Sequence, residues 1–204
     1  MTHPTSPQNS ALSSEALSLL FTGARSHHAW TKREVDDSLL RSIYETGKWA
    51  PTSANTNPGR IVFLKSKAAK ERIYPALMGS NVAQVEGAPV TAIVAQDLRF
   101  FDHLPKLFPQ WPDGKASFEA DSSLAVTTAF RNSSLQGAYF VLAARALGLD
   151  VCPMSGFDPK KVDEEFFGGT SWKSNFIFTL GYGDFEKLSP RNPRLTFEES
   201  ARIL

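Results

Sequence analysis

The stretch KWAPTSANTNPGRIVFL, residues 48–64, joins the end of a predicted helix to a short apolar strand. Pro51 and Pro58 each fix φ and remove a backbone donor, so the loop can neither continue a helix nor join a central strand. Its side chains donate and accept hydrogen bonds without carrying charge, namely Thr52, Ser53, Asn55 and Asn57. Such groups suit an uncharged polar ring system better than a phosphate or a metal. The same residue types also build surface turns, which composition alone favours.

Length and composition indicate an ordinary globular protein. The 204 residues are enough for one domain with a buried core, expected at 14–204 after a flexible N-terminus at 1–13. A net charge of +1 does not favour a nucleic-acid or membrane-surface protein. The single cysteine, Cys152, excludes an internal disulfide and fits a reducing compartment. The sequence shows neither a signal peptide nor an apolar run of the ~20 residues that span a membrane, which predicts a cytoplasmic protein.

Apolar periodicity and capping residues predict long helices and few strands. Helices are expected at residues 14–24, 36–48, 67–77, 121–147 and 159–167, with a short one from Phe197. Strands are expected at 60–64, 90–95 and 175–181, whereas 81–87 is short and polar and 151–157 is a turn or short extended piece. The helix at 121–147 is the predicted centre of the core. This pattern favours an α+β protein with one sheet wrapped by helices.

Residues 98–120 differ from the rest of the chain because prolines alternate with aromatic side chains. The prolines are Pro105, Pro109 and Pro112, and the aromatics are Phe100, Phe101, Phe108, Trp111 and Phe118. We expect no regular element here, yet aromatic side chains are unfavourable when exposed. The segment is therefore interpreted as a lid or a dimer contact, with a simple packed loop as the alternative.

The sequence lacks the motifs that mark several classes of enzyme. There is no G-x-G-x-x-G after a strand, no P-loop motif and no G-x-S-x-G elbow. The histidines at 3, 27, 28 and 103 lack metal-ligand spacing, so no metal site is predicted. Asn132-Ser133-Ser134 fits the glycosylation pattern, but on a buried helix of a cytoplasmic protein we interpret it as a false match.

Two further clusters could bind an anion. Arg25-Ser26-His27-His28 follows the first predicted helix, and its guanidinium and hydroxyl suit a phosphate. The tail at 187–194 combines Lys187, Arg191 and Arg194 with two prolines. Each cluster alone is more typical of a solvated helix end or a charged surface turn than of an anion site.

Taken together, these features resemble the nitroreductase family of FMN-dependent oxidoreductases, from about Leu17 to the end of the chain. The resemblance rests on their order and spacing: Arg25-Ser26, PTSANTN at 51–57, Asn81 followed by Ala88-Pro89, Gly148-Leu149, PMSGF at 153–157 and Arg191. It implies a nitroreductase-like α+β fold with a central, mainly antiparallel sheet. It also implies a homodimer that binds FMN at the subunit interface.

The resemblance assigns roles at both ends of the cofactor. Arg25 and Arg191 would hold the FMN phosphate, with help from Ser26 and from His27 or Lys187. The partner subunit would supply a loop that touches the ribityl chain and pyrimidine edge, through Pro51, Thr52, Ser53, Asn55 and Asn57. Asn57 stands where the family usually has glutamine, and His28 replaces a common arginine.

The remaining roles concern the flavin ring. Asn81 would face the ribityl chain or ring edge, and Pro153 and Met154 would lie against the ring. The backbone amides of Ser155 and Gly156 would lie near flavin N5. Ser155 replaces a glutamate common in the family, so the reduction potential would differ.

The implied reaction is ping-pong hydride transfer through flavin N5 with NADH or NADPH as reductant. Within the family, KWAPTSAN, TAFRNSS, PMSGFD and GYGD resemble most closely the malonic semialdehyde reductases of the Rut pathway of pyrimidine degradation. This implies reduction of malonic semialdehyde to 3-hydroxypropionate, with Arg131 or Arg99 as candidates to bind the substrate carboxylate. The alternatives are a broad nitro or quinone reductase and a flavin-binding protein without catalytic turnover.

Overall fold

A computed structural model describes residues 11–204, and within that range the strands form one four-stranded antiparallel sheet in the order β1-β2-β4-β3. The strands are β1 (Gly59–Leu64), β2 (Val90–Asp97), β3 (Asp150–Met154) and β4 (Trp172–Gly181). Most of the flexible terminus expected at 1–13 lies outside the described residues. Within residues 11–204 no helix is both long and apolar enough to cross a membrane.

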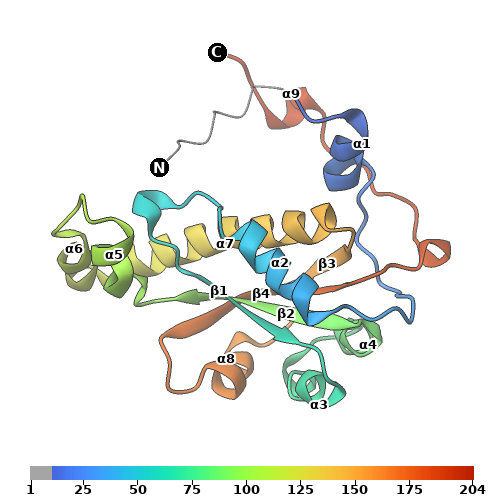
Figure 1. Cartoon of the computed structure of the whole chain (residues 1–204), viewed down its shortest axis with the longest axis horizontal. Coiled ribbons are helices and arrows are strands. Elements are labelled where there is room, and N and C mark those ends of the chain that lie inside the picture. The colour runs from blue at the N-terminus through green and yellow to red at the C-terminus, as the bar shows by residue number, and fades with distance from the viewer. Residues whose placement is uncertain (1–10) are drawn as a thin grey trace.

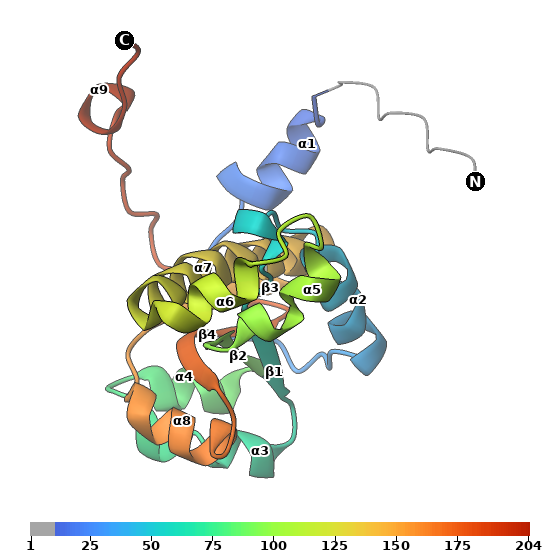
Figure 2. The ribbon, with the colours of Figure 1, turned by 90° about the vertical axis from the view of Figure 1, so that its left-hand side faces the viewer.

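Helices cover both faces of the sheet (Figure 1). On one face lie α2 (Asp37–Gly47) and α7 (Ser122–Ala146), and on the other α3 (Lys67–Glu71), α4 (Asn81–Gly87) and α8 (Pro159–Phe167). The shorter helices are α1 (Ser14–Leu17), continued by a π-helical turn at Ser18–Thr22, α5 (Leu104–Leu107), α6 (Gly114–Ala120) and α9 (Phe197–Ser200). Figure 2 shows that α1 and α9 project from the body of the domain.

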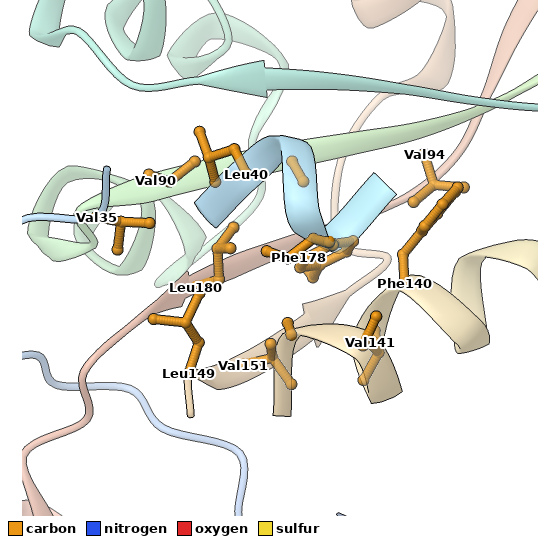
Figure 3. Close-up of a cluster of buried hydrophobic side chains, with 14 residues drawn as sticks. Val35, Leu40, Val90, Val94, Phe140, Val141, Leu149, Val151, Phe178 and Leu180 are labelled. Carbon is orange, nitrogen blue, oxygen red and sulfur yellow. The ribbon is translucent and has the colours of Figure 1, made fainter. Parts of the chain in front are cut away.

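Strand alternation divides the core into two layers. Val90 and Val94 of β2 pack with Phe140 of α7 on one face of the sheet (Figure 3). Ile93 points to the other face, where it packs with Ile177 of β4. Successive side chains of a strand point to opposite faces, and here both faces are covered by helices. This explains why the predicted strand at 90–95 is almost entirely apolar.

The capped helices form as predicted. The Asp121 carboxylate accepts a hydrogen bond from Leu124 N at 2.9 Å and begins α7. Asp158 caps α8, whose first residue is Pro159. These motifs require contacts only two or three residues apart, so the sequence alone specifies them.

Other predicted elements were wrong or incomplete. The helix expected at 67–77 ends at Glu71, because Pro75 lacks an amide and would clash with the carbonyl four residues earlier, and a 3-10 turn follows at Tyr74–Ala76. The polar segment 81–87 is helix α4. The piece expected to be a turn is the fourth strand, β3, which accommodates Pro153 because it lies at the edge of the sheet.

The segment 98–120 contains regular structure, contrary to the sequence-based expectation. A 3-10 turn (Phe100–His103) precedes α5 and α6, and Pro105 is tolerated in the first turn of α5. Phe100 and Phe118 meet edge to face, with 4.9 Å between ring centroids, and pack with Ala125 and Ala129 of α7. The segment is thus a small aromatic core of its own, attached to the N-terminal half of α7.

Candidate functional site

Two predicted anion-binding clusters, from opposite ends of the chain, meet in one cavity. Arg25 donates a hydrogen bond to Ser189 O, and Arg191 Nη2 donates to Ala24 O at 2.9 Å. Between them lies a cavity of about 550 Å³, lined in part by Ser26, His28, Arg145 and Lys187. None of the described residues that line it is acidic. The cavity is therefore cationic, and its guanidinium and hydroxyl groups suit a phosphate-sized anion.

The structure separates the two adjacent histidines. Ser26 pairs with Val151 as a parallel bridge, and the extended backbone turns successive side chains to opposite sides. His28 lines the cavity, and its Nδ1 lies 3.0 Å from Gln84 Oε1. His27 is fully buried, with Nε2 3.4 Å from Asp150 Oδ1. His27 therefore does not line the cationic cavity as its predicted role requires, and His28 lies there instead.

Burial also changes the acidity of His27. Loss of hydration lowers its pKa, because the charged imidazolium is disfavoured in an apolar setting, and the nearby Asp150 carboxylate only partly opposes this. The Phe185 ring meets the imidazole edge on, at 4.7 Å between centroids. His27 thus helps to anchor the start of the C-terminal tail rather than to bind an anion.

The edge strand β3 connects the cationic cavity to a second group of predicted residues. Pro153 and Ser155 are exposed at its end, whereas the Met154 side chain is buried in the core. The Asn81 amide donates to Gly156 O at 2.8 Å, and a Cβ at position 156 would lie 2.6 Å from Asn81 Nδ2. A larger residue at position 156 would therefore displace the Asn81 amide from this contact. The cationic cavity and the uncharged polar surface around Asn81 and Gly156 thus both lie along the β3 edge of the sheet.

The loop at 51–57 does not join that edge within one chain. Its residues form a 3-10 turn at Ser53–Asn55, and Asn55 and Asn57 line a separate cavity of about 420 Å³. The loop contacts Asn132 of α7, whereas Arg145 of the same helix lines the cationic cavity. Asn132 and Arg145 are 13 positions apart, which corresponds to about 20 Å along the helix axis. The loop therefore contacts the middle of α7, whereas the cationic cavity lies at the C-terminal end of this helix.

Sequence reasoning missed three polar residues that support these surfaces. Gln84 orients His28, and its Oε1 also lies 3.5 Å from Cys152 Sγ. Asn132 and Gln136 contact the loop from α7. The sequence could have indicated Asn132 and Gln136, because they are amides one helical turn apart on a helix predicted to be buried. Buried polar side chains almost always have specific partners. Residues 11–204 contain no group of three or more His, Cys, Asp or Glu side chains that could hold a metal ion.

The chain resembles known proteins over most of its length. A sequence model of the nitroreductase family matches residues 22–182. A Burkholderia lata protein with the provisional name NADH dehydrogenase/NAD(P)H nitroreductase is 55% identical over 192 residues, which are 94% of this chain and 98% of that protein.

Solved structures have the same fold. A provisionally described nitroreductase from Bacillus subtilis matches with a TM-score of 0.84 at 21% identity, over 93% of this chain and 99% of that one. Another from Exiguobacterium sibiricum, solved in complex with FMN, gives a TM-score of 0.83 at 20% identity, over 95% and 99%. These similarities confirm the predicted α+β fold. With the family model covering most of its length, the chain belongs to the nitroreductase family.

Proposed function

We propose that this protein is an FMN-dependent NAD(P)H oxidoreductase that reduces malonic semialdehyde to 3-hydroxypropionate. The observation that carries the proposal is the edge of β3, where a cationic cavity without acidic lining residues continues into an uncharged polar surface. This donor set fits FMN, which has a phosphate at one end and a polar ring system at the other. The FMN bound to the Exiguobacterium structure and the name of the Burkholderia relative support FMN as cofactor and NAD(P)H as reductant.

Different residues of this chain would bind the phosphate and the ring of FMN. Arg25, Ser26, His28 and Arg191 would hold the phosphate, and Asn81 with the 153–156 segment would flank the ring. The chemistry that bound FMN supplies is hydride exchange between NAD(P)H and the substrate. The protein's part is to bind, orient and exclude water.

The substrate carboxylate needs a free cation, and two arginines were candidates. Arg99 is already paired with Asp102 at 2.8 Å and lies 3.5 Å from Glu119. Arg131 is exposed on α7, beside Asn132, and forms no ion pair within the described part of the chain. We therefore assign the carboxylate to Arg131. Arg131→Met should raise KM for malonic semialdehyde about tenfold or more, because an ionic hydrogen bond is lost, and leave KM for an uncharged quinone unchanged. An equal effect on both substrates would contradict this assignment.

We further propose a homodimer in which the loop at 51–57 completes the partner's flavin site. Supporting this, large apolar side chains are exposed on and near α7: Phe21 is 52% exposed, Trp49 79%, Phe130 55% and Tyr139 39%. Exposed apolar side chains gathered on and near one helix favour a subunit contact there. Sedimentation velocity during dilution, recorded at a flavin wavelength, tests the proposal. Flavin should leave as the dimer dissociates, and a verified monomer that retains FMN would contradict the shared site.

A broad-specificity NAD(P)H nitro or quinone reductase is the second candidate, and the name of the Burkholderia relative favours it. Anaerobic reduction with NADH or NADPH, followed by reoxidation with malonic semialdehyde, a nitroaromatic or a quinone, separates the two. A higher kcat/KM for the nitroaromatic would replace the narrower proposal with the broader one. A yellow protein that neither reductant bleaches would instead be a flavin-binding protein without turnover.

A further inference from the structure

Two buried amide side chains lie one turn apart on the central helix. Asn132 is 3% exposed and Gln136 is 4% exposed, and residues four apart lie on the same face of a helix. Burying an amide is unfavourable unless its donors and acceptors find partners. The partners of these two residues therefore indicate why α7 carries them.

Both amides hold the loop that follows α2. Asn132 Oδ1 accepts a hydrogen bond from Ser53 N at 2.8 Å, and its Nδ2 donates to Thr128 O. Gln136 Oε1 accepts from Gly59 N at 2.6 Å, and its Nε2 lies 3.3 Å from Asn57 Oδ1. A Cβ at Gly59 would lie 2.7 Å from Gln136 Oε1, so the close approach requires glycine. The two side chains thus fix the loop at its start and at its end.

Between these points the backbone adopts an unfavourable conformation. Ala54, Asn55 and Asn57 have φ values of 46°, 49° and 43°. L-residues rarely adopt left-handed backbone, and Ala54 lacks even the short polar side chain that makes it tolerable in asparagine. Such conformations persist only when the surrounding structure imposes them, and they concentrate at functional sites.

Internal hydrogen bonds alone do not attach the loop to the domain. Asn57 N donates to Thr52 Oγ1 at 3.2 Å, and Asn57 Nδ2 donates to Asn55 Oδ1 at 2.7 Å. Asn55 also donates to Leu107 O at 2.8 Å, which connects the loop to α5. The amides of α7 tie the loop to the helix that packs against every strand of the sheet.

We propose that Asn132 and Gln136 are positioning residues that hold residues 53–59 in the strained form required to bind flavin. The inference rests on the proposed function, in which this loop is one wall of the FMN site. On this view the two amides preorganise the loop, so that little conformational entropy is lost when the cofactor binds.

The test compares flavin binding with apo-protein stability. Asn132→Leu and Gln136→Met keep side-chain volume but remove the polar contacts, and each should weaken FMN binding about tenfold in a fluorescence titration. The matched control is Ser133→Ala. Ser133 is fully buried on the same helix, but its hydroxyl accepts from Asn175 of β4 at 2.8 Å and donates to Phe130 O, so its hydrogen bonds do not involve the loop. This control should lower the apo melting temperature and leave FMN affinity unchanged.

A conservative substitution provides an independent readout. Gln136→Glu keeps the acceptor for Gly59 N, and only its protonated form has a donor for Asn57 Oδ1. Its FMN affinity, relative to wild type at the same pH, should recover as pH falls. An affinity ratio that does not change with pH would overturn the inference.

The remaining outcomes also separate the two proposals. A wild-type protein that binds no FMN would overturn the proposed function. If wild type binds FMN and both isosteric variants bind it equally well, the positioning role is wrong. A second result would also contradict the positioning role. It is that the loss of FMN affinity per degree of lost apo melting temperature is the same for Ser133→Ala as for the two isosteric variants.

Discussion

Arg25 and Arg191 each hold the chain segment that carries the other. Arg25 bonds Ser189 O, two residues before Arg191, and Arg191 bonds Ala24 O, immediately before Arg25. A guanidinium has five donors, so both arginines keep donors available for a ligand. The cationic cavity therefore exists only once the C-terminal tail has docked beside the residues that follow α1.

Removal of either arginine should weaken cofactor binding. Arg25→Ala and Arg191→Ala each delete a charge-assisted contact, so we expect the Kd for FMN to rise roughly 10- to 100-fold. The effect should shrink at high salt, because screening weakens the same contact in the wild type. Equilibrium dialysis at two salt concentrations measures it, with the exposed Lys160 of α8 changed to alanine as the control. Unaltered FMN binding in both variants would place the phosphate elsewhere.

The strain at Ala54 predicts a stabilising substitution. Its φ of 46° is unfavourable for alanine by about 1–2 kcal/mol, whereas glycine adopts it freely but has more entropy in the unfolded chain. Ala54→Gly should therefore raise the free energy of unfolding by about 0.5–1 kcal/mol and the melting temperature by ~2 °C. Ala116→Gly, at an exposed helical position in α6, should do the opposite. A lower melting temperature for Ala54→Gly would show that the backbone is not strained there.

Burial of His27 predicts a loss of stability in mild acid. Its pKa is lowered in the folded protein from the ordinary value of 6.5, so the unfolded chain binds the proton more readily. Stability is therefore complete above pH 6.5 and falls as pH drops below it, by at most about 1.4 kcal/mol per pH unit from this group. Chemical denaturation at pH 8, 7, 6 and 5.5 would show this decline.

The variant His27→Gln isolates that contribution, since carboxylates titrate in both proteins. At pH 8 its unfolding free energy should be lower than that of the wild type, because the substitution removes the packing against Phe185. Its unfolding free energy should also depend less steeply on pH. Parallel pH profiles for the two proteins would assign the acid sensitivity to other groups.

Cys152 should be unreactive in the folded protein. Burial raises the pKa of its thiol to about 11, so roughly one molecule in a thousand is the thiolate at pH 8. We expect iodoacetamide to modify the denatured protein completely and the native protein far more slowly, as followed by intact mass. Rapid labelling of the native form at pH 8 would mean that β3 opens readily.

Sequence alone determined the elements that depend on short-range chemistry. The caps of α7 and α8, the polar content of the loop at 51–57 and the apolar character of β2 are all readable over a few residues. The family resemblance added the order of the predicted cofactor-binding motifs, and the matched family model confirmed the family.

Tertiary structure decided what depends on distant residues. It placed His28 rather than His27 at the cavity, because pairing of Ser26 with β3 sets which side chain faces outward. The segment from residue 151, which was expected to be a turn or short extended piece, forms the edge strand β3, because β4 supplies its backbone hydrogen-bond partners. Tertiary structure also joined Ser53 to Asn132 across 79 residues of sequence. Local periodicity and capping reach only three or four positions along the chain, whereas packing against the sheet sets these longer contacts.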